Sequence, residues 1–219
     1  MNFPLEDYAS LIFDCDGVLL NSNPIKTRAF YKATLPYGED AATAMVDYHL
    51  SNGGISRYEK FDYFLEEIIS SRQKGPEKNE LLENFAREVR SGLLSCEISP
   101  GIQELRIKTS LARWCVVSGG DQEELRYVFG ERGLKDFFDG GIFGSPDSKD
   151  EIIAREREYG NICFPALFLG DSKYDYDTSI RAGVDFVFVS DWSEFTGWRG
   201  FFDGRSNVIG KLAQLTERS

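Results

Sequence analysis

The sequence of 219 residues has a single histidine, no paired-cysteine motif and no long hydrophobic run. Its four cysteines, Cys15, Cys96, Cys115 and Cys163, show no C-x-x-C spacing, which argues against a zinc site or a disulfide framework. Three of them stand in or beside apolar runs, so we expect reduced thiols in a cytoplasmic protein. The segment MNFPLEDYAS lacks the features of a secretory signal, and no run approaches the length that spans a bilayer. We therefore expect no membrane partner.

Basic residues are also in the minority. The chain has 25 Lys and Arg against 36 Asp and Glu, which gives a net charge of −11. Nucleic acids and anionic membranes repel such a protein, so neither is expected as a partner. A metal cation and a small ligand fit the charge better. A chain of this length can form one large core with a smaller insert, and we expect a monomer or a homodimer.

Short apolar segments recur between stretches with a helical period. They are residues 10–14, 114–118, 140–144, 166–171 and 185–190. Their apolar character is continuous, without alternation, which is typical of parallel strands that helices bury on both faces. The sequence therefore predicts an α/β fold with a doubly wound parallel sheet.

The segment between the first two apolar runs has a different character. It contains helix-period stretches such as SRYEKFDYFLEEIIS and KNELLENFAREVRSGLL, and turn-forming clusters stand near its ends. We predict an α/β core of residues 1–19 and 97–219, with a helical cap of residues 20–96 inserted into it. Near the C-terminus, only a closing helix around NVIGKLAQLT is predicted.

The stretch LIFDCDG places Asp14 and Asp16 at the end of the first apolar run. Two carboxylates held so close repel each other, and burial adds to the cost, so the pair needs neutralisation or a chemical role. A bound cation would supply both. In parallel sheets ligands bind outside the carboxyl ends of the strands, which is where Asp14 is expected.

Other polar residues are expected at the same edge of the sheet. Ser118 and Gly119 end the second run, just before a predicted helix. A hydroxyl and free backbone N–H groups at a helix N-terminus suit an anion such as phosphate. Ordinary N-cap hydrogen bonding explains these residues equally well. Asp171 ends the fourth run. Asp175 and Asp177 follow in a first helical turn, where the helix dipole favours acids in any case.

Lys149 is predicted at a position that is unfavourable for a lysine. A capping box of Ser148 and Glu151 would place Lys149 at the first helical position, where it opposes the helix dipole by about 0.3–1 kcal/mol if exposed. Lys149 is either an exposed surface lysine without a functional role, or a cation that nearby carboxylates and a phosphate stabilise. We favour the second interpretation.

Taken together, these motifs resemble the haloacid dehalogenase superfamily of phosphotransferases. They stand here as DCDGVLL (14–20), VVSGG (116–120), SPDSK (145–149) and GDSKYDYDTSIRAG (170–183). The helical insert after the first motif resembles the cap of the subgroup that contains phosphoglycolate phosphatase and β-phosphoglucomutase. The resemblance implies a magnesium-dependent phosphatase that acts on a small phosphorylated sugar, polyol or acid through an aspartyl-phosphate. A β-phosphoglucomutase-like mutase and a non-catalytic sensor of a phosphorylated metabolite are the alternatives.

The resemblance also implies a role for each motif residue. Asp14 would be the nucleophile, Asp16 the general acid and base, and Ser118 and Lys149 the residues that hold the phosphate, beside Gly119. Mg²⁺ would be bound by Asp14, the backbone carbonyl of Asp16 and Asp171, with Asp175 as a direct or water-bridged partner.

Three residues of the insert are candidates for substrate binding. The segment GGISR at 53–57 resembles the part of the β-phosphoglucomutase cap in which an arginine contacts the phosphate that is not transferred. Arg57 would bind a distal group there, or it would be exposed beside a capping box of Ser56 and Glu59. His49 has a substrate role or a structural one. Lys26 stands where the mutase has a histidine, which favours hydrolysis over mutase activity, and it faces either the site or solvent.

Overall fold

The computed structural model describes residues 4–69 and 73–217, and its centre is a parallel sheet of six strands. The strands are β1 (Ser10–Phe13), β2 (Arg113–Asp121), β3 (Gly141–Ser145), β4 (Ala166–Gly170), β5 (Asp185–Val189) and β6 (Asn207–Ile209). Their order is β3-β2-β1-β4-β5-β6. The chain thus winds outward from β1 in both directions, and the predicted doubly wound sheet is confirmed.

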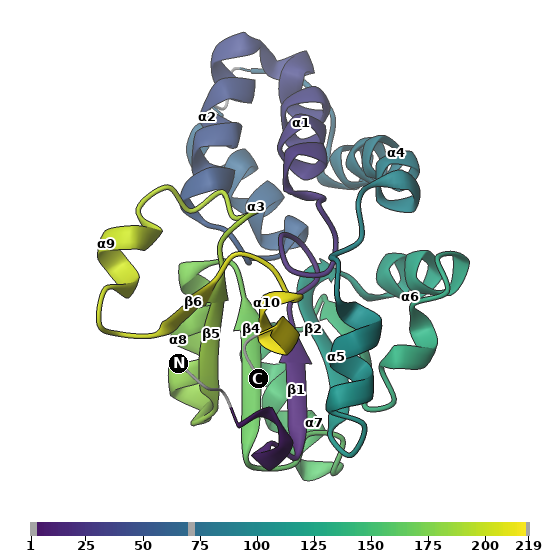
Figure 1. Ribbon diagram of the computed structural model, residues 1–219. Helices are drawn as coiled ribbons and strands as arrows, with labels where there is room; N and C mark the ends of the chain where they lie inside the picture. Colours follow the sequence, from purple (N-terminus) through teal and green to yellow (C-terminus); the bar gives the residue numbers. More distant parts are fainter. Residues whose placement is uncertain (1–3, 70–72, 218–219) are drawn as a thin grey trace.

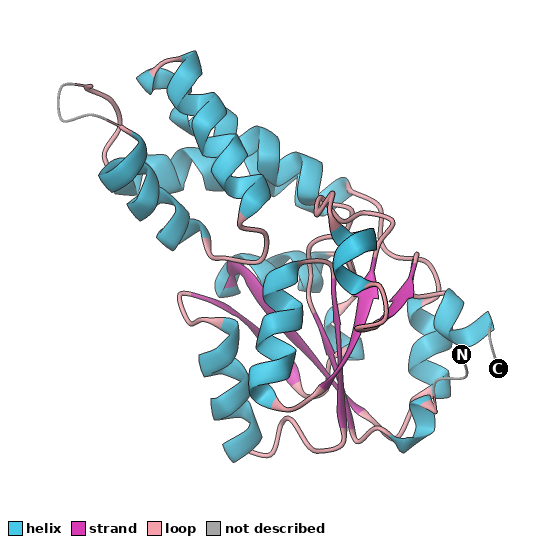
Figure 2. Cartoon of the chain, turned by 90° about the vertical axis from the view of Figure 1, so that its left-hand side faces the viewer, coloured by secondary structure: helices cyan, strands magenta, loops and turns pink. Residues whose placement is uncertain are grey.

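Helices cover both faces of this sheet (Figure 2). One face packs against α5 (Ile102–Lys108), α6 (Gln122–Glu131) and α10 (Gln214–Glu217), and the other against α7 (Lys149–Glu158), α8 (Lys173–Ala182) and α9 (Trp198–Phe202). Successive side chains of a strand point to opposite faces, so Leu11 and Phe13 join one apolar cluster while Ile12 joins the other. Because both faces are buried, the strands have continuous apolar sequences.

A group of helices follows β1 and lies beyond the carboxyl ends of the strands (Figure 1). It comprises α1 (Asn23–Thr34), α2 (Glu39–Ser51), α3 (Arg57–Tyr63), which continues as a π-helical turn (Phe64–Ile68), and α4 (Lys78–Ser95). Short 3₁₀ helices occur at Leu5–Asp7, Leu35–Tyr37 and Lys135–Phe137. We call residues 23–95 the helical insert; the exact domain boundaries remain a prediction.

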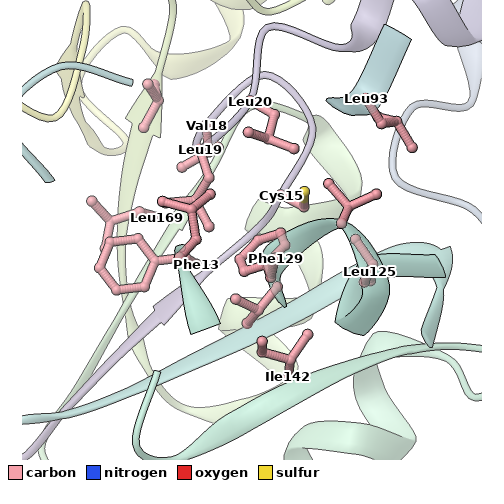
Figure 3. Packing of buried hydrophobic residues seen from close by; sticks show 14 of the residues in the cluster. Phe13, Cys15, Val18, Leu19, Leu20, Leu93, Leu125, Phe129, Ile142 and Leu169 are labelled. Atoms are coloured by element: carbon pink, nitrogen blue, oxygen red, sulfur yellow. The ribbon is translucent and has the colours of Figure 1, made fainter. Parts of the chain in front are cut away.

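Two connections join the helical insert to the sheet, and they lie side by side. The amide of Asn21 donates to the carbonyl of Glu97 (2.9 Å), and the amide of Ser99 donates to the carbonyl of Leu19 (2.9 Å). Figure 3 shows buried apolar side chains close to this point, where Leu20 and Leu93 belong to the same cluster as Leu125 of α6. The insert therefore shares a hydrophobic cluster with the α/β unit.

The prediction for the C-terminal segment was partly wrong. Asn207–Ile209 forms the edge strand β6 beside β5, and only Gln214–Glu217 is helical. A three-residue strand is too short to show a strand period, and its pairing with β5 overrides the helical pattern of the sequence.

All four cysteines are free thiols, with Cys15 and Cys115 buried and Cys163 exposed. Within residues 4–69 and 73–217, none of the helices combines the length and the apolar character that crossing a bilayer requires.

Candidate active site

The loop after β1 presents Asp14 at the edge of the sheet that faces the helical insert. Asp14 is 3% exposed, and its Oδ1 accepts a hydrogen bond from the amide of Cys15 (2.7 Å). Gly17 closes this loop with a φ of +73°, and a Cβ there would lie 2.0 Å from Oδ2 of Asp171. Glycine is required for both reasons, because other residues rarely adopt this φ and none fits beside Asp171.

Three carboxylates from different elements meet at this edge. Asp14 follows β1, Asp171 follows β4 and Asp175 lies in the first turn of α8, and their ligand atoms all lie within 4.8 Å of one another. All three side chains are buried. Burial raises the pKa of Asp14 and of Asp171, and the neighbouring carboxylates raise both further.

Lys149 lies beside this acidic cluster. Ser148 and Glu151 form the predicted capping box, which places Lys149 at the first position of α7. Its Nζ lies 2.9 Å from Oδ2 of Asp14 and donates a hydrogen bond to Oδ1 of Asp175. Burial alone would lower the pKa of Lys149, but these two carboxylates raise it. Lys149 is 1% exposed, so the surface-lysine alternative is wrong.

The acidic cluster fits a divalent cation. With all groups ionised, three carboxylates and one ammonium carry a net charge of −2, and carboxylate oxygens are the ligands that Mg²⁺ prefers. Asp175 has less freedom than the others, because its Oδ2 accepts hydrogen bonds from the amide (3.1 Å) and the hydroxyl (2.6 Å) of Ser172. Since Lys149 engages its other oxygen, both carboxylate oxygens of Asp175 already have hydrogen-bond partners within the protein.

Asp16 is not part of the acidic cluster and has its own hydrogen-bond and ion-pair partners. Its Oδ1 accepts a hydrogen bond from the Ser22 hydroxyl (2.5 Å), and its Oδ2 forms an ion pair with Lys26. Burial would raise the pKa of Asp16, but Lys26 and Ser22 together lower it. Lys26 is 8% exposed and therefore faces the site, not solvent.

Ser118 and Gly119 lie in the last part of β2. The Ser118 side chain is fully buried, and its Oγ accepts from the amide of Gly120 (3.0 Å). It is not the N-cap of α6, because that role belongs to Asp121, whose Oδ1 accepts from the amide of Glu124 (2.8 Å). Gly119 faces the insert so closely that a Cβ would lie 2.3 Å from the carbonyl oxygen of Gly54.

A cavity of about 330 Å³ opens between the edge of the sheet and the helical insert. The sheet side contributes Asp14, Asp16, Gly119, Asp171, Ser172 and Lys173, and the insert contributes Lys26, Phe30, His49, Arg57, Lys60 and Phe85, among other residues. A site of this size accommodates a small metabolite.

Arg57 lines the cavity from the first turn of α3, but it already has a partner. Both of its terminal nitrogens contact the carboxylate of Glu124, and its guanidinium lies over the ring of Phe85, 4.6 Å from the centroid. Arg57 is 6% exposed, so the exposed alternative is wrong. Its neighbour Tyr58 donates a hydrogen bond to Asp121 (2.7 Å), which adds a second contact from α3 to the core.

His49 lies at the end of α2 and is buried. Its Nδ1 lies 2.7 Å from Nζ of Lys60, and its Nε2 lies 3.2 Å from Oγ1 of Thr27. Burial lowers the pKa of His49 well below its usual range, and Lys60 and Lys26 lower it further, so the ring is neutral.

Sequence reasoning did not identify Lys60, Glu194 or Asn23 as site residues. Asn23 donates to Oδ2 of Asp171 (2.7 Å) and to the carbonyl of Trp192 (2.9 Å). Lys60 stands three residues after Arg57, a helical spacing that could have indicated a shared face. Glu194 comes from the loop after β5 and carries no comparable signal.

The sequence matches the family described as haloacid dehalogenase-like hydrolase over residues 8–183, which is most of the chain. The chain belongs to this family. It is therefore an enzyme of the hydrolase class, and the family assignment made from the motifs is confirmed.

Solved structures share the fold. A β-phosphoglucomutase from Clostridium difficile is 21% identical with a TM-score of 0.71, covering 95% of this chain and 93% of its own. A predicted phosphatase from Clostridium acetobutylicum is 16% identical with a TM-score of 0.73, covering 96% and 97%. CbbY from Rhodobacter sphaeroides, solved in complex with phosphate, is 16% identical with a TM-score of 0.71, covering 95% and 96%. No curated protein matches the chain.

Proposed function

We propose that this haloacid dehalogenase-like hydrolase is a magnesium-dependent phosphatase that acts on a small phosphorylated metabolite. The observation that carries the proposal is the buried cluster of Asp14, Asp171 and Asp175 with Lys149, of which Asp14 and Asp171 line a cavity of about 330 Å³. A predicted phosphatase with this fold supports the proposal, and a β-phosphoglucomutase with the same fold keeps the mutase as the alternative.

Asp14 is the nucleophile in this proposal. Its carboxylate attacks phosphorus, a P–O bond forms to Asp14 and the bond to the leaving alcohol breaks, which gives an aspartyl-phosphate. The amide of Cys15 holds Oδ1 of Asp14, and Lys149 lies beside Oδ2. These contacts fix the carboxylate at the edge of the cavity and so orient it for in-line attack.

Asp16 moves the protons. It protonates the leaving alkoxide in the first step and, in the second, takes a proton from the water that attacks phosphorus and releases Asp14. Its pairing with Lys26 and Ser22 favours the ionised form, which is the base of the second step. We therefore expect the substrate to displace Lys26 in part before Asp16 acts as an acid.

The remaining charges stabilise the phosphoryl group. Lys149 and Ser118 hold its oxygens in the proposal, and Gly119, which follows Ser118 in β2, lines the cavity. Asp14, the backbone carbonyl of Asp16 and Asp171 would hold Mg²⁺, which when bound offsets the repulsion between Asp14 and the phosphate. Asp175 contributes by positioning Lys149.

The helical insert acts as the cap in this proposal. Gly54 lies against Gly119, and a Cβ on Gly54 would lie 2.9 Å from Oγ of Ser172, so the loop 53–57 packs against the residues that follow Ser118 and Asp171. Arg57 and Tyr58 bind this loop and α3 to α6. A cover of this kind excludes water and selects the alcohol portion of the substrate.

Phosphate release from a panel of small phosphate esters, with and without magnesium, tests the proposal. We expect magnesium-dependent release by the native protein and none by Asp14→Asn. Asp136→Asn, which alters an exposed acid of the same fold, serves as the matched control. Conversion of β-glucose 1-phosphate that needs a bisphosphate primer and releases no phosphate would instead show the mutase, and binding without turnover would show the sensor.

A further inference from the structure

The insert side of the cavity contains a buried amine that the proposed chemistry does not use. Lys60, on α3, is 2% exposed and lines the cavity together with the rings of Phe30 and Phe85. Its Nζ lies over the Phe30 ring, 5.4 Å from the centroid. A buried ammonium is costly unless it is paired, so Lys60 requires an explanation.

The other lysines and arginines of the cavity wall, as far as the chain is described, have carboxylate partners. The pairs are Lys26 with Asp16, Arg57 with Glu124 and Lys173 with Asp177. No carboxylate of residues 4–69 or 73–217 lies within ion-pair distance of Lys60. Lys60 is therefore the cation of this wall whose charge the described protein leaves uncompensated.

A directed chain of hydrogen bonds holds Lys60 in place. The Thr27 hydroxyl donates to Glu194 (2.9 Å), so it must accept from Nε2–H of His49 (3.2 Å). The Nδ1 of the neutral ring then accepts from Lys60 (2.7 Å). Glu194 lies at the opposite edge of the ring, 3.8 Å from Nε2, so it orients His49 without pairing with Lys60. Lys60 keeps two N–H groups beyond this bond.

We propose that Lys60 determines substrate specificity by binding a second anionic group, a carboxylate or a phosphate, at the end of the substrate away from the transferred phosphoryl group. The inference rests on the proposed phosphatase function and deepens it. It assigns the distal contact to Lys60, because Glu124 already occupies both terminal nitrogens of Arg57. His49 is a positioning residue, and it acts through Lys60.

The charge balance around Lys60 favours an anion over a neutral hydroxyl. Burial, and after it the charge of Lys26, lower the pKa of Lys60 to about 7, against weaker opposing effects of Asp16 and Glu194. An anionic group in contact with Nζ would reverse this effect and form a charge-assisted hydrogen bond. A neutral hydroxyl would leave the ammonium buried and uncompensated.

The test compares two series of phosphate monoesters on short alkyl chains of increasing length, one ending in a carboxylate or a second phosphate and one ending in a hydroxyl. We expect native kcat/KM to favour the anionic series by about tenfold or more at the best chain length. Lys60→Met should abolish this ratio, and Lys60→Arg should keep part of it. Lys135→Met, a change at an exposed lysine, should leave the ratio as in the native protein.

Binding is measured in parallel by calorimetry, with the same esters and Asp14→Asn alone or combined with Lys60→Met. If no ester is hydrolysed by the native protein, the phosphatase proposal fails, while the binding ratio still tests Lys60. Equal preference for the two series in the native protein would overturn the assignment, as would a preference that survives Lys60→Met in both assays. A preference for one anion over the other identifies whether the distal group is a carboxylate or a phosphate.

Discussion

The uncompensated charge of Lys60 has a consequence for stability that is independent of any substrate. An amine in the unfolded chain has a pKa near 10.5, and burial among cations lowers the folded value to about 7. At about 1.4 kcal/mol per pKa unit, this difference costs the folded state about 4 kcal/mol at about pH 7. At about pH 9 the folded amine is already neutral, and the cost falls to about 2 kcal/mol.

Lys60→Met removes this cost while keeping a side chain of similar shape. The sign follows from the depressed folded pKa: the unfolded chain binds more protons between about pH 7 and about pH 10, so the native protein gains stability as the pH rises through that window. We therefore expect Lys60→Met to be more stable than the native protein, with a gain about 2 kcal/mol larger at about pH 7 than at about pH 9.

Urea unfolding of both proteins at the two pH values measures this gain. Other titrating groups change the unfolding free energy of both proteins alike, so their contribution cancels when the variant is compared with the native protein. Lys135→Met, which also removes one positive charge, controls for the change in net charge. A gain that is the same at both pH values, or a variant less stable than the native protein at about pH 7, would refute the reasoning. Such a result would mean that water or an unrecognised partner compensates Lys60.

Three further predictions concern the proposed site. Lys149→Met leaves buried carboxylates without their cation, so we expect loss of phosphate release and an unfolding free energy lower by about 3–5 kcal/mol, measured in urea; retained stability would contradict this. Gly119→Ala forces the insert loop away from Gly54, so we expect kcat/KM to fall at least about tenfold, whereas Gly130→Ala, whose Cβ meets open space, should leave it unchanged. Magnesium should raise the melting temperature of the native protein and not that of Asp171→Asn; equal shifts would place the cation elsewhere.

Much of the α/β unit could be predicted because buried parallel strands leave a simple signal. The runs at 10–14 and 166–171 are apolar throughout, since helices cover both faces, and each ends at an aspartate that the structure brings to one edge. Lys149 could be identified because a capping box fixed its position and the helix dipole opposed it. Local rules were sufficient for these residues.

The insert side of the site could not be predicted in the same way, because its contacts join distant segments. Nothing in the spacing of Arg57 indicates that Glu124, on a helix of the core, neutralises it. The chain from Lys60 to Glu194 passes through two other helices and a loop after β5. The edge strand β6 also depends on a neighbour, since its pairing with β5 decides its conformation.

The central claim is that Asp14 carries the phosphoryl group during turnover. Rapid acid quench of the native protein with magnesium and a hydrolysed ester, followed by peptide mapping by mass spectrometry, tests it most directly. We expect one phosphoryl group on Asp14 in the native protein and none in Asp14→Asn. Phosphate release with no phosphorylated Asp14, or a phosphoryl group on another residue, would contradict it.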